Sequence, residues 1–131
     1  MHKIIDIQEF TDSRGRMNVI EFSQILGFTP KRMFSIQDVP IKSMRGDHAH
    51  KKCIQALHCL IGRVEAQLEN GGEKTSVLLD NPVRILLIPA NTWLKLYFLE
   101  EKTILNVYTS DLYEESDYIR DYNEFSKANL T

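Results

Sequence analysis

The sequence has few of the features that mark membrane, secreted or nucleic-acid-binding proteins. It contains no apolar run near the roughly 20 residues that a membrane-spanning helix needs. The formal net charge of −2 at pH 7 argues against a general binder of nucleic acids or of membrane surfaces. Strand-like sequence follows directly after Met1–Lys3, so we expect no signal peptide.

Cysteine and flexible linkers are also scarce. Cys53 and Cys59 are the two cysteines, and both lie in an apolar stretch. We interpret them as reduced, buried thiols of a cytoplasmic protein. No internal repeat, low-complexity tract or linker divides the 131 residues. This length is enough for one domain and too small for two ordinary ones, so we expect residues 1–131 to form a single domain.

Short strand-like runs fill most of the chain. They lie at 4–7, 17–22, 32–36, 54–61, 63–69, 75–79, 83–88, 93–99 and 103–109. Turn residues separate them, most clearly at Asp12–Gly15 and Asn70–Gly72, and the first two runs would pair as an N-terminal hairpin. The nearly continuous apolar run 83–88 fits a strand that is buried on both faces. Many short strands at regular spacing predict an all-β sandwich or barrel.

The C-terminal region has a different pattern. Aromatic and apolar residues recur at helical spacing over residues 116–125, and Ser116 is a suitable N-cap. We therefore expect one short helix that lies on the β core.

The most informative segment is Arg45–Lys52, in which one residue separates His48 from His50. In an extended strand, side chains at i and i+2 leave the same face, so both imidazoles would enter one cavity. Imidazole titrates near neutral pH and therefore suits proton transfer or metal binding. The basic neighbours Arg45 and Lys51 suit an anionic ligand, and arginine can clamp a phosphate with two hydrogen bonds. The alternative interpretation is a histidine-rich turn on the surface.

Metal binding is the first possible use of the histidine pair. The layout resembles the cupin barrel, in which a glutamate and a third histidine complete the metal site. Here Gln55 stands where that glutamate would be, and Leu94 takes the place of the third histidine. Two imidazoles and one neutral amide are a poor ligand set for zinc or iron, so we expect no bound metal. Metal-free acid–base chemistry suits the pair better, with one histidine as base and a second group at the carbonyl oxygen.

The resemblance becomes specific over longer motifs. Residues 45–52, Arg-Gly-x-His-Ala-His-Lys-Lys, resemble the signature of the dTDP-4-keto-6-deoxyhexose 3,4-ketoisomerases, which are cupin enzymes of deoxysugar biosynthesis. Residues 110–122 resemble the C-terminal segment of members of the same family, and Phe10-x-Asp12-x-Arg14-Gly15 resembles their N-terminal motif. The resemblance covers nearly the whole chain. It implies an all-β cupin, that is, a jelly-roll β-barrel with a short C-terminal helix.

The resemblance also implies an activity and a site. The enzyme would move the carbonyl group of a dTDP-linked 4-keto-6-deoxyhexose from C4 to C3 through an enediolate, without a cofactor. By position, His48 and His50 are the catalytic acid–base pair. The implied substrate-binding residues are Arg45, Arg14, Gln55, Lys51 and Trp93. Trp93 would stack on a base or sugar, although a lone tryptophan in a β protein more often packs in a core or a dimer interface. The family forms homodimers that exchange N-terminal strands, so Arg14 would serve the partner's site.

Two differences from the family pattern bear on the site. Leu94 follows Trp93 where family members tend to have histidine, which removes a possible proton relay. Ser35 stands where tyrosine is frequent, which would empty part of the sugar pocket. These differences favour one alternative, a non-catalytic cupin that binds a sugar nucleotide. A metal-dependent cupin enzyme is the other alternative.

Overall fold

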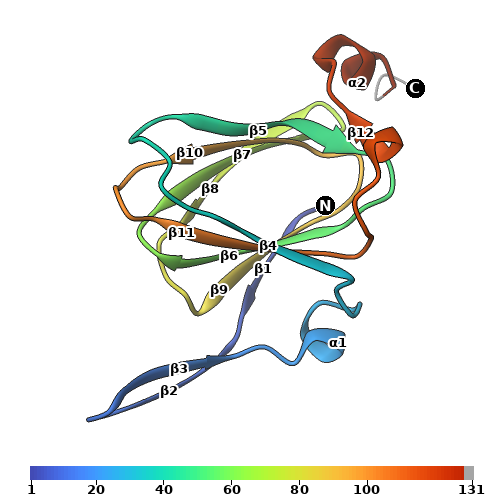
Figure 1. Cartoon of the computed structure of the whole chain (residues 1–131). Helices are drawn as coiled ribbons and strands as arrows, with labels where there is room; N and C mark the ends of the chain where they lie inside the picture. Colours follow the sequence, from blue (N-terminus) through green and yellow to red (C-terminus); the bar gives the residue numbers. More distant parts are fainter. Residues whose placement is uncertain (129–131) are drawn as a thin grey trace.

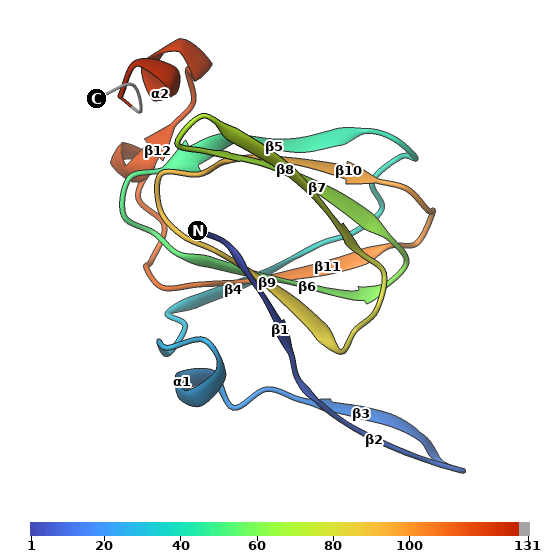
Figure 2. The same ribbon diagram turned by 180° about the vertical axis from the view of Figure 1, so that it is seen from behind.

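A computed structural model describes residues 1–128 and shows two facing β-sheets that form a flattened barrel (Figures 1 and 2). The elements in chain order are β1 (Lys3–Asp6), β2 (Gln8–Asp12), β3 (Gly15–Val19), α1 (Phe22–Ile25), β4 (Arg32–Ile36), β5 (Met44–His50), β6 (Gln55–Ile61), β7 (Val64–Asn70), β8 (Glu73–Leu79), β9 (Arg84–Ile88), β10 (Trp93–Phe98), β11 (Ile104–Thr109), the 3₁₀ helix η1 (Glu115–Asp117), β12 (Tyr118–Ile119) and α2 (Tyr122–Ala128).

Each large sheet contains five strands, and neighbouring strands are antiparallel. One sheet has the order β1-β9-β6-β11-β4 and the other has the order β12-β5-β10-β7-β8. Strands close in sequence are therefore often in different sheets, as β5 and β6 are. The predicted all-β jelly-roll barrel with a short C-terminal helix is confirmed.

The main core lies between the two sheets, and a smaller core lies outside the first. Leu86 and Ile88 of β9 point into the main core, whereas Ile85 packs with Leu26 in the outer core. This confirms the prediction that 83–88 contains a strand buried on both faces. Apolar burial of this kind supplies most of the stability of a small β domain. Both cysteines are buried and free, as predicted.

The N-terminal hairpin differs from the predicted pairing. The hairpin is formed by β2 and β3, while β1 pairs with β9 of the first sheet. Figures 1 and 2 show the hairpin projecting from the barrel, and it is not hydrogen-bonded to either five-stranded sheet. The last residue of the predicted strand 17–22, Phe22, instead begins α1, and its ring packs on Tyr108 with the ring centroids 5.1 Å apart.

The prediction of a helix over 116–125 with Ser116 as its cap is wrong. Ser116 lies in η1, and the two residues of β12 pair with His50 and Ala49 at the end of β5. Helix α2 begins only at Tyr122. Its N-cap is Asp121, whose Oδ1 accepts hydrogen bonds from the backbone amides of Asn123 and Glu124, at 2.8 and 3.2 Å. No helix within residues 1–128 has the length and apolar character needed to cross a membrane.

Candidate active site

Strand β5 carries the histidine pair and contains a bulge just before it. Leu94 of β10 pairs with His48 but the next residue of β10 pairs with Gly46, so Asp47 is an extra residue on β5. Gly46 and Asp47 have φ values of +81° and +65°, and left-handed backbone is common at such bulges. The extra residue shifts the alternation of side chains along the strand. Arg45 therefore reaches the same face as His48.

A cavity of about 400 Å³ lies between the two sheets on this face of β5. Its size is in the range of small-ligand pockets. Apolar side chains of β4, β6, β10 and β11 form much of its wall. The polar and charged side chains that line it are Arg45, His48, Gln55, Tyr118 and Arg120.

The two imidazoles lie on one face of β5, as their spacing predicts. Their ring centroids are 5.2 Å apart and the rings are nearly perpendicular, at 88°. His48 lines the cavity, whereas His50 is buried behind it and is only 4% exposed. The ring of Tyr118 packs against both, with centroid distances of 5.0 Å to His48 and 4.3 Å to His50. The three rings form one cluster at the cavity wall.

A buried carboxylate orients His50. The Nδ1 atom of His50 lies 2.9 Å from Oδ2 of Asp117. Asp117 also accepts hydrogen bonds from the backbone amides of Lys52 and Cys53, at 2.8 and 3.4 Å. Burial acts to raise the pKa of Asp117, but these hydrogen bonds outweigh it and hold the pKa below its ordinary value. Asp117 is therefore ionised, His50 Nδ1 carries the proton, and the Nε2 lone pair stays free. Nε2 is buried and has no partner within residues 1–128.

Burial also keeps both histidines neutral. Burial and, to a lesser extent, the nearby His50 lower the pKa of His48 to about 4. Burial lowers the pKa of His50 as well, although Asp117 opposes this effect. Neutral imidazole has a lone pair, so each ring can accept a proton at neutral pH.

The other predicted site residues separate into two groups. Arg45 and Gln55 line the cavity, as expected for residues that contact a ligand there. Lys51 is exposed beyond the end of β5, and its backbone amide donates to the carbonyl of Asp117 at 2.8 Å. Arg14 lies at the turn of the projecting hairpin, its side chain 87% exposed. The structure brings neither Lys51 nor Arg14 into the cavity of its own chain.

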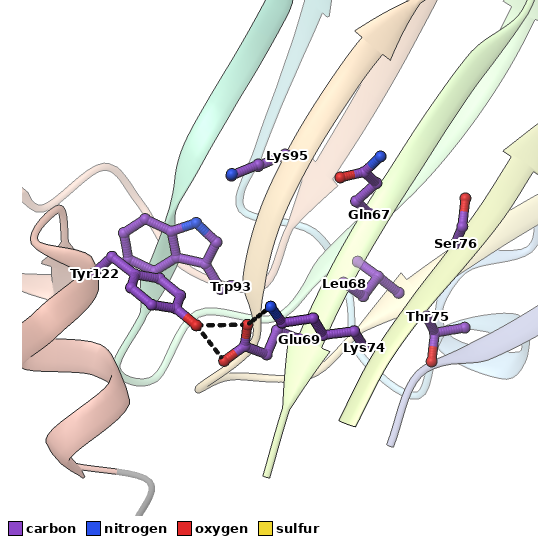
Figure 3. Close-up of a pocket in the computed structure, with 9 residues that line it drawn as sticks. All are labelled: Gln67, Leu68, Glu69, Lys74, Thr75, Ser76, Trp93, Lys95 and Tyr122. Carbon is purple, nitrogen blue, oxygen red and sulfur yellow. Dashed lines mark hydrogen bonds and ion pairs between the residues drawn. The ribbon is translucent and has the colours of Figure 1, made fainter. Parts of the chain in front are cut away.

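Trp93 belongs to a different surface. Because Leu94 points into the barrel, Trp93 points outward, where its Nε1 donates to Oδ1 of Asp47 at 3.1 Å. Figure 3 shows Trp93 beside Tyr122 in a second pocket, of about 470 Å³, on the outer face of β7, β8 and β10. Trp93 is only 3% exposed and packs with Phe125 of α2. The structure therefore gives Trp93 a packing position and keeps it out of the barrel cavity.

The two departures from the family pattern have different positions. Leu94 lines the cavity and pairs with His48 across β5 and β10, so it lies beside the histidines as expected. The expectation that Ser35 empties part of the pocket is wrong. Its neighbours Phe34 and Ile36 line the cavity, so Ser35 points to the other face of β4, where it donates to Asn106 at 2.5 Å.

Sequence reasoning missed three residues of the site, which are Asp117, Tyr118 and Arg120. They were placed in the predicted helix 116–125, where their side chains would have spread around the helix axis. The available signal is an alternation over Asp117–Arg120, in which every second side chain is aromatic or basic. Such a period of two indicates a short strand.

One group of potential metal ligands occurs within residues 1–128. Atoms of His50, Cys53 and Asp117 lie within 4.8 Å of one another. Asp117 is already engaged by three hydrogen bonds. Burial raises the pKa of the Cys53 thiol, which disfavours the thiolate that binds metals. The donor set therefore fits a hydrogen-bonded His–Asp pair better than a metal site.

Comparison with known proteins identifies relatives along the whole chain. Residues 1–129 match the family described as FdtA: WxcM-like, C-terminal. A relative from Aneurinibacillus thermoaerophilus, named TDP-4-oxo-6-deoxy-alpha-D-glucose-3,4-oxoisomerase, is 35% identical over 126 residues, which are 96% of this chain and 91% of the relative.

Solved structures agree with this relationship. The sugar 3,4-ketoisomerase QdtA from Thermoanaerobacterium thermosaccharolyticum, in complex with TDP, has a TM-score of 0.95 at 31% identity and covers 98% of this chain and 94% of its own. A 3,4-ketoisomerase from Helicobacter canadensis has a TM-score of 0.94 at 33% identity and covers 99% and 98% of the two chains. The chain therefore belongs to the FdtA, WxcM-like C-terminal family.

Proposed function

We propose that the chain is a nucleotide-sugar 3,4-ketoisomerase, which moves the carbonyl group of a TDP-linked 4-keto-6-deoxyhexose from C4 to C3 in deoxysugar biosynthesis. The observation that carries the proposal is the neutral His48–His50 pair, in which His48 lines a ligand-sized cavity and His50 is buried directly behind it. The relatives support the substrate class, since one is named for a TDP-4-oxo-6-deoxyglucose and QdtA was solved with TDP. One carbon of the sugar is oxidised while its neighbour is reduced, so no redox cofactor is consumed.

His50 is the base that acts on carbon. Because Asp117 accepts the Nδ1 proton, the free Nε2 lone pair of His50 can take the proton from C3 of the sugar. The electrons of the broken C–H bond form the double bond of an enediolate between C3 and C4. His50 then returns its proton to C4, which leaves the carbonyl at C3. Asp117 stabilises the imidazolium that exists between these two transfers.

His48 serves the oxygens. A backbone hydrogen bond to Gly46 engages one side of its ring, and its low pKa keeps the ring neutral. Its lone pair accepts the hydroxyl proton at C3 and delivers it to the oxygen at C4. With this transfer the atoms and charges of the isomerisation balance. Arg45 and Gln55, the other polar residues of β5 and β6 in the wall, bind the substrate.

A second copy of the chain would complete the site. Phe10 and Met17 face each other across the hairpin and are 54% and 57% exposed, although both are large and apolar. An exposed apolar surface of this kind is typical of a protein interface. We expect a homodimer that exchanges N-terminal strands and brings Arg14 to the partner's cavity. Sedimentation would then show a dimer, and the variants Phe10→Asp and Met17→Asp would shift it toward monomer; a monomeric wild type would contradict this proposal.

Hydrogen exchange with solvent separates the enzyme from a non-catalytic binding protein. The protein is incubated with TDP-4-keto-6-deoxyglucose in D₂O, and deuterium at C3 and C4 is followed by NMR. We expect wild-type protein to introduce deuterium, and His50→Ala and His48→Asn each to abolish the exchange while TDP affinity stays within tenfold. Unlabelled sugar with wild-type protein would favour the binding protein. Stoichiometric iron, zinc or manganese in the purified protein would favour the metal-dependent alternative.

We also propose that the enzyme works in the cytoplasm as a single domain. The two buried free thiols suit a reducing compartment. Fractionation of cells that express the tagged chain would test this, and recovery in a membrane or extracellular fraction would contradict it.

A further inference from the structure

The cavity wall contains more positive charge than the chain as a whole. The chain has a net charge of −2, yet the two charged side chains that line the cavity are both arginines, Arg45 and Arg120. Among the described lining residues there is no carboxylate. A local surplus of guanidinium groups in an otherwise acidic chain selects for an anionic ligand.

Arg120 is placed in the wall by strand β12. Tyr118 and Ile119 pair with the end of β5, and Arg120 follows directly. Residues two apart share a face of a strand, so Arg120 and Tyr118 both face the cavity. The guanidinium carbon lies 4.3 Å from the centroid of the Tyr118 ring, and that ring is itself in contact with both histidines. One aromatic ring therefore separates the cation from the acid–base pair.

Glu115 holds Arg120 by one edge only. Nε and Nη2 of Arg120 donate to the two carboxylate oxygens of Glu115, at 2.7 and 2.9 Å. The hydroxyl of Tyr113 donates to the same carboxylate at 2.5 Å. A guanidinium group has five N–H donors, so this contact leaves the opposite edge available for a second bidentate partner. Glu115 and Tyr118 thus fix the group before any ligand binds.

We infer that Arg120 binds the diphosphate of the sugar nucleotide, together with Arg45, and that Glu115 is its positioning residue. This inference rests on the proposed function and adds a binding residue that comes from the C-terminal segment. The diphosphate is attached directly to the hexose. When the hexose contacts the histidines, the diphosphate must therefore lie close to them, and Arg120 is separated from the histidines by only the Tyr118 ring. Strand β12 thereby supplies both Tyr118 against the histidines and the cation for the phosphates.

The test compares the affinity for TDP with that for thymidine, which lacks phosphates, by calorimetry. Charge-assisted hydrogen bonds to a phosphate predict that Arg120→Gln weakens TDP binding by about 10- to 100-fold. Thymidine binding should stay within twofold. Arg63→Gln is the matched control, because Arg63 also pairs with a glutamate, Glu100, at 3.0 Å, and has a similarly exposed side chain, 47% against 53% for Arg120. It should bind TDP like the wild type.

Removing Arg120 also leaves Glu115 unpaired, and its charge alone could repel a diphosphate. The double variant Arg120→Gln/Glu115→Gln has the wild-type net charge and removes this effect. TDP binding should remain weak in the double variant, and Arg120→Lys, which keeps the charge but loses the two-pronged geometry, should bind with intermediate affinity. Wild-type TDP affinity in the double variant would overturn the inference and leave the proposed function intact. Failure of wild-type protein to bind TDP at all would overturn both.

Discussion

At the scale of single residues, the two histidines are chemically alike but have different partners. His50 is tied to Asp117, which fixes its tautomer and leaves Nε2 free. His48 has no carboxylate partner among the described hydrogen bonds, and its pKa falls to about 4. In the proposed mechanism the two side chains take different roles because their environments differ, as in other acid–base pairs.

Replacement of Asp117 tests this division of roles. In Asp117→Asn the ionic hydrogen bond to His50 is lost, so we expect kcat to fall by about 10²-fold with little change in KM. Because Asp117 raises the pKa of His50, its loss should also move the acidic limb of the kcat profile to lower pH. Steady-state kinetics from pH 5 to 8 would measure both effects.

The control for this variant is Asp47→Asn. Asp47 bonds to Trp93 on the outer face of β5, so its loss should leave kcat within about twofold, as surface substitutions generally do. Equal losses in the two variants would show that Asp117 has a structural role alone.

Single residues also show what the sequence could and could not predict. The pair His48 and His50 is evident from the sequence, because a spacing of two residues along one strand is enough to place both side chains on the same face. Asp117 is 67 positions from His50, and no local pattern reports that the two side chains meet. Ser35 illustrates the opposite error, since family resemblance suggested a pocket position that the alternation along β4 excludes.

At the scale of elements, the strands were predictable and their irregularities were not. The runs that become β6 to β11 are visible as apolar alternation between turn residues. The bulge at Gly46 and Asp47 was not predicted, although a glycine inside a strand often marks a bulge. Without the bulge, Arg45 would lie on the face opposite His48. A C-terminal helix is present, but its predicted start at Ser116 is wrong, because pairing of β12 with β5 outweighs the helical spacing of the apolar residues there.

The bulge can be tested with alanine at two glycines. Gly46 and Gly72 have nearly the same φ, +81° and +84°, but a Cβ at Gly46 would lie 3.0 Å from the carbonyl oxygen of Leu94, whereas at Gly72 it would meet nothing within 4 Å. Left-handed backbone costs alanine about 1–2 kcal/mol at either position. We expect Gly72→Ala to lose this amount in urea unfolding and keep its kcat/KM.

Gly46→Ala should lose more stability than Gly72→Ala, because the carbonyl of Leu94 must also move. It should raise KM as well, since the bulge brings Arg45 to the cavity. Identical stability and kinetics of the two variants would show that the close contact at the bulge does not position the site.

At the scale of the whole molecule, the barrel keeps titratable groups out of water. His48, His50 and His58 all have pKa values lowered by burial. The ring of His58 lies outside the main core, and its Nε2 donates to the carbonyl of Pro82 at 2.6 Å. Burying neutral histidines couples the free energy of unfolding to pH, because these histidines bind protons in the unfolded chain at pH values where they stay unprotonated in the folded chain.

The sign of this coupling gives the last prediction. From about pH 7.5 upward, one unit above the ordinary histidine pKa, the three histidines are almost entirely neutral in both states and contribute almost nothing to the pH dependence. As the pH falls from 6.5 toward 4, the unfolded chain binds protons first, so the free energy of unfolding should decrease. Each histidine can contribute at most about 1.4 kcal/mol per pH unit. Urea unfolding at pH 7.5, 6, 5 and 4.5, at one fixed protein concentration because a dimer would add a concentration dependence, would measure this slope. His48→Asn removes one of the three groups and should flatten it, whereas a wild-type stability that is constant from pH 6.5 to 4.5 would contradict the burial of these rings as neutral groups.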